Sequence, residues 1–391
     1  MTRISPARLT ALDVLERVSN GAYASDSLRE AAAPLTARDA ALASQIVFGT
    51  LRFQAQLDFL IGCYSGRKAA SLDVPVLLAL RTGIFQLRYL ERIPAHAAVH
   101  EAVEWTKRRA RSASGFVNAV LRKVNRNAVA WPDSATELSV PNWLLERWTK
   151  HFGPETATGI AEAGLQQPES YIRIPPGLEP PSGIVVEATD VPGAYRITSA
   201  VPDGVRLHDV SSQSIVPLLG LEPGNSYLDL CAAPGNKTLQ ALETPLSLSI
   251  ACDVSPSRIR EIPPVCDRVV LDATRPLPFS RAFDGIFIDA PCSGTGTLAR
   301  NPEIKWRVST QDFERLGEKQ ALIAHQSVAC LAEGGTLVYA TCSLEPEENE
   351  SVIERLLESH SELRLERELW RIPGRDPGDG FYAAVVKKAP I

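Results

Sequence analysis

The chain has 391 residues, 45% hydrophobic and 22% charged, a composition that is typical of a globular protein and excludes a disordered or fibrous one. Its length suggests two or three domains. It has no apolar run of roughly eighteen residues, which excludes a membrane-spanning helix. Residues 1–13 lack the apolar segment of a secretory signal, so we expect a cytoplasmic protein.

The formal charge is divided unevenly along the chain. The whole chain carries −5, but residues 1–150 hold 20 Lys and Arg against 13 Asp and Glu, or +7, and residues 151–391 hold the other 21 and 33, or −12. No acid lies between Trp105 and Pro132. A solvated helix face usually mixes both signs, so a surface that contacts nucleic-acid phosphates is an equal alternative here. The basic residues of this stretch are Lys107, Arg108, Arg109, Arg111, Arg122, Lys123 and Arg126.

The first 126 residues predict an all-α bundle. Ser5 before Pro6 is typical of a helix start, and Gly21 of a helix end. Apolar residues at helical spacing predict further helices at residues 40–52, 54–63, 74–90, 97–109 and 114–124.

A less regular region follows the bundle. We expect a helical piece at residues 143–164 and short strands at residues 171–174 and 183–186, among seven prolines that fall between Pro168 and Pro202. The chain is therefore divided into a helical domain at residues 1–130, a small α+β connecting module at 131–205 and a third domain at 206–391.

The third domain alternates strands with helices, which predicts a doubly wound, mainly parallel α/β sheet of Rossmann-like type. Such sheets bind ligands at the carboxyl ends of their strands. Polar residues gather at those ends: Asp229, Asp253, Asp272, Asp289 and the pair Thr341-Cys342. Strands are predicted at residues 226–230, 248–253, 268–272, 285–289, 335–340 and 381–387, and the longest helix at residues 311–331.

The turn after the first of these strands, at residues 231–237, favours a nucleoside ligand. It lacks the glycines of a P-loop and those of a dinucleotide fingerprint. Asp253 is placed to accept from ribose hydroxyls and Asp272 from an adenine amino group. One such aspartate would be read as a helix cap, but three at consecutive strand ends favour an adenosine site, most simply for S-adenosylmethionine.

Two of the seven cysteines end strands of this sheet, Cys292 and Cys342. A thiolate that adds to carbon-6 of a pyrimidine activates carbon-5 toward an electrophilic methyl group, and Asp289 is placed to serve as the acid near N3. Spacing does not decide which thiol is the nucleophile. No two cysteines are spaced as Cys-x-x-Cys, the pattern typical of a zinc site, and we expect no metal. Buried packing is expected for Cys63, Cys252, Cys266 and Cys330.

Several of these motifs resemble the Sun (Fmu) RNA cytosine-5 methyltransferases: residues 228–238, 289–294 with 301–306 (NPEIKW), 340–349 (ATCSLEPEEN) and 378–382. Residues 208–213 are similar to a lead-in in which the family usually has Gln where this chain has His208. Residues 93–103 and 116–122 resemble a NusB-type RNA-binding bundle. The family loop also has a second glycine where this chain has Asn236, a residue that tolerates a left-handed backbone.

The resemblance implies that Cys342 is the nucleophile, that Cys292 assists product release, and that the substrate is one cytosine of 16S rRNA, met before or during small-subunit assembly. Lys305 and Arg307 are expected to add RNA contacts, and the protein to be a monomer. A transfer RNA substrate and a non-catalytic RNA-binding factor with a degenerate methyltransferase domain stay open as alternatives. The implied cofactor residues are Cys231, Ala232, Ala233, Pro234, Gly235, Asn236, Lys237, Asp253, Asp272 and Asp289.

Overall fold

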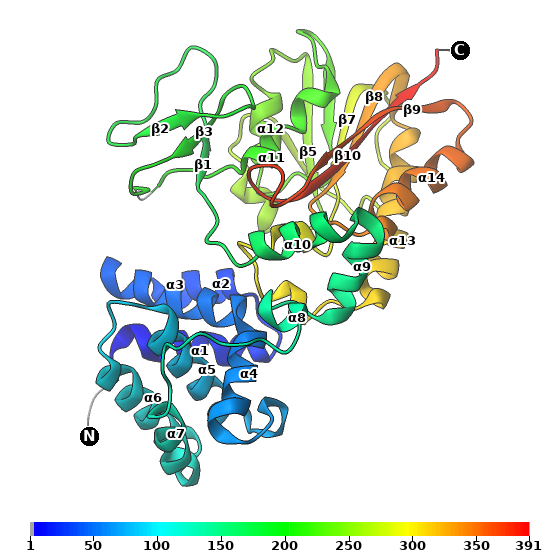
Figure 1. Ribbon diagram of the computed structural model, residues 1–391. Coiled ribbons are helices and arrows are strands. Elements are labelled where there is room, and N and C mark those ends of the chain that lie inside the picture. The colour runs from blue at the N-terminus through cyan, green and yellow to red at the C-terminus, as the bar shows by residue number, and fades with distance from the viewer. Residues whose placement is uncertain (1–3, 203, 391) are drawn as a thin grey trace. The chain divides into compact units, whose positions relative to one another are not determined.

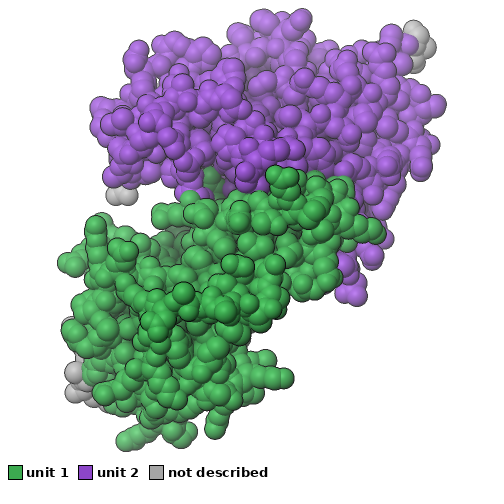
Figure 2. Space-filling view, in the orientation of Figure 1, with its two compact units in different colours: residues 1–167, 298–307 green, residues 168–297, 308–391 purple. Residues whose placement is uncertain are grey.

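The computed structural model describes residues 4–202 and 204–390; residues 1–3 of the segment considered above for a secretory signal lie outside this range. The chain forms two compact units (Figure 2). Unit 1 consists of Met1–Gln167 and Leu298–Arg307, and unit 2 of Pro168–Thr297 and Val308–Ile391. The predicted connecting module is thereby divided: its helices belong to unit 1 and its strands to unit 2. Among the described residues no helix is long and apolar enough to cross a membrane.

Unit 1 is helical, as predicted (Figure 1). Pro6 begins the first helix, and Gly21, with φ +102°, follows its end. The predicted helix at residues 143–164 is two helices, because Gly153 has φ +86° and Pro154 starts a new helix after it. The elements are α1 Pro6–Ser19, α2 Ala24–Ala32, α3 Ala37–Arg52, α4 Gln54–Ser65, η1 Ala69–Ser71, α5 Val74–Tyr89, α6 Ala95–Arg109, η2 Arg111–Ala113, α7 Ser114–Leu121, α8 Ser134–Glu137, α9 Asn142–Phe152, α10 Pro154–Ala163 and η6 Ile304–Trp306.

Residues 298–307 belong to unit 1 although they are more than a hundred positions from its other residues in sequence. Hydrogen bonds from side chains to backbone carbonyls fix them there. Arg52 donates to the carbonyl of Ala299 at 2.7 Å, and Lys305 Nζ donates to the carbonyl of Arg52 at 3.0 Å. The indole of Trp306 donates to the carbonyl of Leu51 at 2.9 Å. Side chains of this segment therefore satisfy carbonyls at the end of α3 that have no partner within the helix.

Unit 2 begins with a small antiparallel sheet in the order β1-β3-β2, formed by Tyr171–Arg173, Ala194–Ile197 and Val186–Ala188. The strand predicted at residues 183–186 is observed at Val186–Ala188, and β3, Ala194–Ile197, was not predicted. Its register places Tyr195 opposite both Ile172 and Ala188.

The main sheet of unit 2 has seven strands in the order β6-β5-β4-β7-β8-β10-β9. The first five are parallel, β10 pairs antiparallel with β8, and β9 pairs antiparallel with β10 at the edge. The predicted Rossmann-like sheet is thus confirmed. The strands are β4 Ser226–Asp229, β5 Leu248–Asp253, β6 Asp267–Val270, β7 Phe283–Asp289, β8 Leu331–Thr341, β9 Leu363–Arg371 and β10 Phe381–Lys388.

Helices cover both faces of this sheet, because the central strands are buried on both sides. Ile286 and Ile288 of β7 pack into a cluster with residues of α13 and α14, whereas Phe287 between them packs with Ile215 and Ala241 on the other face. Figure 1 shows α13 and α14 beside the sheet. The helices of unit 2 are α11 Val210–Gln213, η3 Val216–Leu219, α12 Asn236–Ala241, η4 Arg258–Glu261, η5 Thr295–Thr297, α13 Thr310–Val328, η7 Pro346–Glu348 and α14 Glu350–Ser359.

His208 precedes α11 and is buried, with its ring Nε2 3.0 Å from the hydroxyl of Ser212. Burial and the charges of nearby Lys237, Arg173 and Arg206 lower the pKa of His208 to about 2. The folded protein therefore holds this ring neutral, whereas the unfolded chain protonates it near pH 6.5. The unfolding free energy consequently falls as the pH drops below about 6.5.

We expect His208→Gln to make the unfolding free energy less dependent on pH, because glutamine does not titrate. At pH 5 the wild-type protein should have lost about 2 kcal/mol from this source relative to neutral pH, and the variant should not. Urea unfolding between pH 5 and 7 measures the difference. His96→Gln, on the exposed part of α6, is the control, and equal pH slopes for wild type and His208→Gln would contradict the assignment.

Candidate active site

A cavity of about 260 Å³ lies at the carboxyl ends of the parallel strands. Because β4, β5, β7 and β8 point the same way, the segments that follow them meet at one edge of the sheet. The cavity brings together predicted cofactor and catalytic residues. Its lining consists of Leu230, Cys231, Ala233, Asp253, Val254, Arg258, Leu271, Asp272, Ala273, Asp289, Ala290, Pro291, Cys292, Lys319, Ile323 and Cys342.

The turn after β4 depends on Gly235. This residue has φ +98°, and a Cβ built on it would lie 2.9 Å from Ile262 Cγ1. A glycine is required there both by conformation and by space. Of the other predicted turn residues, Cys231 and Ala233 line the cavity, while Ala232 is buried.

Asn236 does not take the left-handed conformation that the sequence suggested. It is the first residue of α12, and Gly235 before it carries the positive φ. The Asn236 side chain instead accepts a hydrogen bond from Arg206 and donates to the carbonyl of Leu207 at 2.9 Å. Arg206 also donates to the carbonyl of Pro234. The amide therefore joins the turn to the segment before α11, a contact that a glycine could not make.

Two of the carboxylates predicted to bind the cofactor line the cavity. Asp253, at the end of β5, accepts from the backbone N–H of Ser255 at 2.8 Å and of Ala233 at 3.3 Å. Asp272 lies two residues beyond β6, and hydrogen bonds from Thr274 lower its pKa. Both orientations are thus fixed by local donors, while each carboxylate keeps acceptor capacity for a ligand, which in Asp272 is on Oδ2 because Thr274 donates twice to Oδ1.

Sequence reasoning missed the cations of the cavity. Arg258 lines it and donates to the carbonyl of Ala233 at 2.8 Å. Lys319 of α13 lines it as well. Neither residue lies in a strand-end motif, so only the folded position reveals them.

Lys237 is paired with Asp289 across the cavity edge, with 2.6 Å between Nζ and Oδ2. Its ammonium also lies 5.0 Å from the centre of the Phe381 ring. Burial alone would lower the pKa of Lys237, but the charge and hydrogen bond of Asp289 outweigh it and raise that pKa. The site therefore holds a charged ammonium next to the carboxylate that was predicted to meet the base.

The two strand-end thiols are neighbours: Cys292 Sγ lies 3.1 Å from Cys342 Sγ. A hydrogen bond with Cys342, together with burial, raises the pKa of Cys292 well above its usual value. Cys252 and Cys330 are buried packing residues as expected, and Cys266 is half-buried. Cys63 is exposed on α4, so the expectation of buried packing was wrong for that residue.

The seven basic residues of the predicted RNA surface are all exposed in unit 1, but the fold engages most of them. Lys107 pairs with Glu104 at 2.6 Å and Arg109 with Glu16 at 3.0 Å. Three others donate to carbonyl or amide oxygens of their own unit: Arg122, Lys123 and Arg126. Arg108 and Arg111 are solvent-exposed cations at the end of α6 and in η2.

Lys305 and Arg307, also predicted to contact RNA, do not lie on an open surface. Lys305 is 2% exposed, and burial lowers its pKa to about 7. Arg307 donates to the carbonyls of Val18 and Ala22. Both side chains hold residues 298–307 in unit 1, and the structure does not support a phosphate contact for either.

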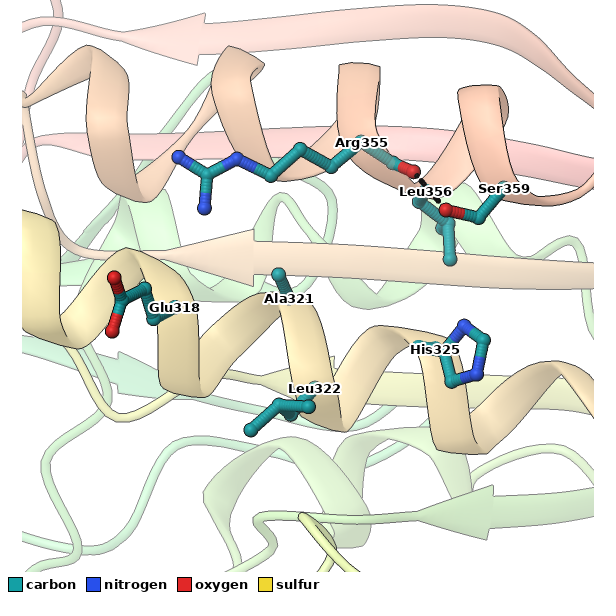
Figure 3. Close-up of a pocket in the computed structure, with 7 residues that line it drawn as sticks. All are labelled: Glu318, Ala321, Leu322, His325, Arg355, Leu356 and Ser359. Carbon is teal, nitrogen blue, oxygen red and sulfur yellow. Dashed lines mark hydrogen bonds between the residues drawn. The ribbon is translucent and has the colours of Figure 1, made fainter.

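A second cavity, of about 460 Å³, lies between α13 and α14 (Figure 3). It holds Glu318, Ala321, Leu322, His325, Arg355, Leu356 and Ser359. It contains neither a thiol nor a strand-end carboxylate, so none of the predicted catalytic and cofactor residues lines it. Across the described residues no cluster of three or more His, Cys, Asp and Glu side chains could hold a metal ion.

Known proteins match both parts of the chain. Residues 216–387 match the family model described as "16S rRNA methyltransferase RsmB/F", and residues 5–126 match the NusB family. Ribosomal RNA small subunit methyltransferase B of Shigella sonnei (strain Ss046) is 32% identical, with 97% of this chain and 98% of the relative covered. The protein of the same name from Escherichia coli O157:H7 is 33% identical over the same shares.

Solved structures share the fold. The crystal structure of PH0851 has a TM-score of 0.81 at 20% identity and covers 99% of this chain and 100% of its own. A methyltransferase homolog protein from Pyrococcus horikoshii has a TM-score of 0.56 at 23% identity and covers 66% of this chain and 100% of its own. With relatives above 30% identity that extend over nearly its whole length, the chain belongs to the RsmB/F family of 16S rRNA methyltransferases.

Proposed function

We propose that this protein transfers a methyl group from S-adenosylmethionine to carbon-5 of a cytosine in 16S rRNA, through a transient bond between Cys342 and carbon-6 of the base. The observation that carries the proposal is the 3.1 Å separation of the Cys292 and Cys342 sulfurs in a cavity that also holds strand-end carboxylates. Family membership supports methyl transfer and a small-subunit rRNA substrate.

The donor set of the cavity fits S-adenosylmethionine. Asp253 presents acceptor oxygens at the end of the second parallel strand, where ribose hydroxyls are bound in sheets of this type. Val254, Leu271 and Ile323 supply apolar lining, with Asp272 beside them as an acceptor for an amino group. When bound, the cofactor supplies an electrophilic methyl group on a sulfonium sulfur.

The residues at the other end of the cavity fit the chemistry of the base. Addition of the Cys342 thiolate to carbon-6 moves the π electrons of the ring toward carbon-5, which can then take the methyl group. Asp289 meets the N3 side of the ring, and the charged ammonium of Lys237 at 2.6 Å is the nearby proton donor. A water molecule then takes the carbon-5 proton, the double bond re-forms, and the bond between the Cys342 sulfur and carbon-6 breaks.

Cys292 is suited to the second half of this sequence. It bears its proton, because its pKa is raised well above the ordinary value, and its sulfur is within hydrogen-bond distance of the Cys342 sulfur. It can therefore protonate the Cys342 sulfur as that sulfur leaves carbon-6. The target cytosine must leave its stack to reach both thiols, which costs a few kcal/mol and is easiest in a single-stranded loop.

Alanine substitution of each thiol tests the assignment. Cys342→Ala should lower methyl transfer to 16S rRNA by at least about 10³-fold and abolish the covalent protein–RNA complex, because no other thiolate takes its place. Cys292→Ala should leave the complex to accumulate, because release is slowed. Labelled methyl incorporation and denaturing gels measure the two effects.

Cys63→Ala is the matched control, since that thiol is exposed and lies in unit 1. If instead Cys292→Ala abolishes the covalent complex and Cys342→Ala lets it accumulate, Cys292 is the nucleophile and Cys342 assists release. Full activity of Cys342→Ala would exclude the covalent mechanism. If the wild-type protein incorporates no methyl group into RNA, the alternative of a non-catalytic RNA-binding factor is favoured. If it methylates transfer RNA in preference to 16S rRNA, transfer RNA is the substrate.

We further propose that Arg108 and Arg111 of unit 1 contact RNA phosphates. Both are exposed at the end of α6 and in η2. Lys107 and Arg109 beside them are partly neutralised by Glu104 and Glu16. The phosphate contacts of the stretch should therefore depend chiefly on these two arginines.

Replacing both residues, Arg108→Gln with Arg111→Gln, should weaken RNA binding and lower the slope of log Kd against log salt by roughly 1.4 to 1.8, the value for two lost phosphate contacts. Filter binding at several salt concentrations measures the slope. Arg29→Gln, which removes an exposed arginine paired with Asp26 on α2, should leave the slope unchanged. An unchanged slope in the double variant would contradict the proposal.

A further inference from the structure

Glu348 is a buried carboxylate that the mechanism above does not use. It lies at the end of η7 and is 0% exposed. Burial raises its pKa, and hydrogen bonds from Ser293, Ser343 and Gln320 act in the opposite direction. A carboxylate in such a place is stable only if its oxygens are fully used by donors.

Three of the four donors come from the two loops that carry the thiols, and the fourth comes from Gln320 of α13. Glu348 Oε1 accepts from the hydroxyl of Ser293 at 2.5 Å and from that of Ser343 at 2.6 Å. Oε2 accepts from the backbone N–H of Ser293 at 2.8 Å and from Nε2 of Gln320 at 3.0 Å. Ser293 directly follows Cys292, and Ser343 directly follows Cys342.

Neighbouring contacts make this arrangement rigid; we call Glu348 with its bonds to Ser293, Ser343 and Gln320 the clamp. The two serine hydroxyls lie 3.1 Å apart. Gln320 of α13 also donates to the carbonyl of Pro291, the residue before Cys292, at 2.9 Å. Asn349 donates to the carbonyl of Ser343 at 3.0 Å. Both loops are thus fixed to the Glu348 side chain through the serine that directly follows each thiol.

We infer that Glu348 is a positioning residue that holds the thiols of Cys292 and Cys342 in contact by binding the serine after each of them. The inference rests on the proposed function for its catalytic consequence, because the two sulfurs exchange a proton only while they stay within hydrogen-bond distance. A shift of about 1 Å in such a pair costs on the order of 10²-fold in rate.

The donor geometry distinguishes two substitutions. The N–H groups on Oε2 cannot reverse, so that site must stay an acceptor, whereas the two serine hydroxyls on Oε1 can turn and accept. Glu348→Gln can therefore keep its carbonyl oxygen at the Oε2 site and place its NH₂ between the hydroxyls. Glu348→Ala removes all four hydrogen bonds to the carboxylate and with them the side chain that joins the two loops.

Phenylarsine oxide, a reagent that bridges two adjacent thiols, tests the clamp without reference to methyl transfer. Wild type and Glu348→Gln should each bind it with both Cys292 and Cys342 protected from alkylation, and with affinities within about threefold. Glu348→Ala should bind it at least about tenfold more weakly, because the second thiol loses effective concentration. Ser343→Ala, which removes one donor, should lie between them and replaces Glu348→Ala if that variant does not fold.

Methyl transfer supplies the second readout. Glu348→Ala should lower kcat about 10²-fold with the KM for RNA within about threefold, and Glu348→Gln should restore kcat to within about tenfold of wild type. Glu354→Ala, an exposed carboxylate on α14, should change neither readout.

The outcomes separate the clamp from the proposed function. Undiminished arsenical binding by Glu348→Ala and Ser343→Ala would overturn the clamp even if the enzyme methylates cytosine. The expected arsenical series in a wild-type protein that transfers no methyl group would support the clamp and reject the proposed function. Equal loss of kcat in Glu348→Gln and Glu348→Ala would overturn the role of geometry.

Discussion

Parallel pairing of the central strands is the constraint on which the site depends. Strands β4, β5, β7 and β8 run in one direction, so the chain leaves each of them at the same edge of the sheet. The register places Asp289 opposite Ala340, two residues before Cys342. Groups separated by more than a hundred positions in sequence, from Cys231 to Cys342, therefore line one cavity. The apolar clusters on both faces of the sheet stabilise this arrangement of the strands.

The strands set only where the loops begin, and side-chain hydrogen bonds fix what the loops do next. Asp253 holds the turn after β4, and Asn236 ties the same turn to Leu207. Lys237 and Asp289 form an ion pair, and Glu348 joins the two thiol loops. Hydrogen bonds to charged groups contribute about 1.5 to 3 kcal/mol each where they are buried. In irregular segments without a backbone ladder, such contacts decide the position of the reactive atoms.

Much of this organisation could be predicted from the sequence, because long apolar periodicity and strand-end motifs are local signals. The helices of unit 1 except α2 and α8, the seven-stranded sheet apart from β9, and the meeting of Cys292 with Cys342 follow from such signals. Strand β9 was missed because Arg367 interrupts the alternation of Leu363, Leu365 and Leu369 with charged residues, and five consecutive residues of the strand are exposed. Lys305 was misassigned because its charge indicated a surface position, whereas its partner is the carbonyl of Arg52, some 250 residues earlier in sequence. Glu348 lay in a recognised motif, but its role depends on two serines that only the fold brings together.

The chain leaves unit 2 after Thr297, shortly after Cys292, contributes residues 298–307 to unit 1, and re-enters unit 2 at Val308. The helical unit is therefore not an independent module joined by one flexible linker. Deletion of residues 1–167 would remove the carbonyls of Leu51 and Arg52 and leave Trp306 and Lys305 without the acceptors that they have in the intact chain. The two units are for this reason structurally interdependent. Loss or exchange of residues 1–167 through recombination would require a redesigned segment at residues 298–307.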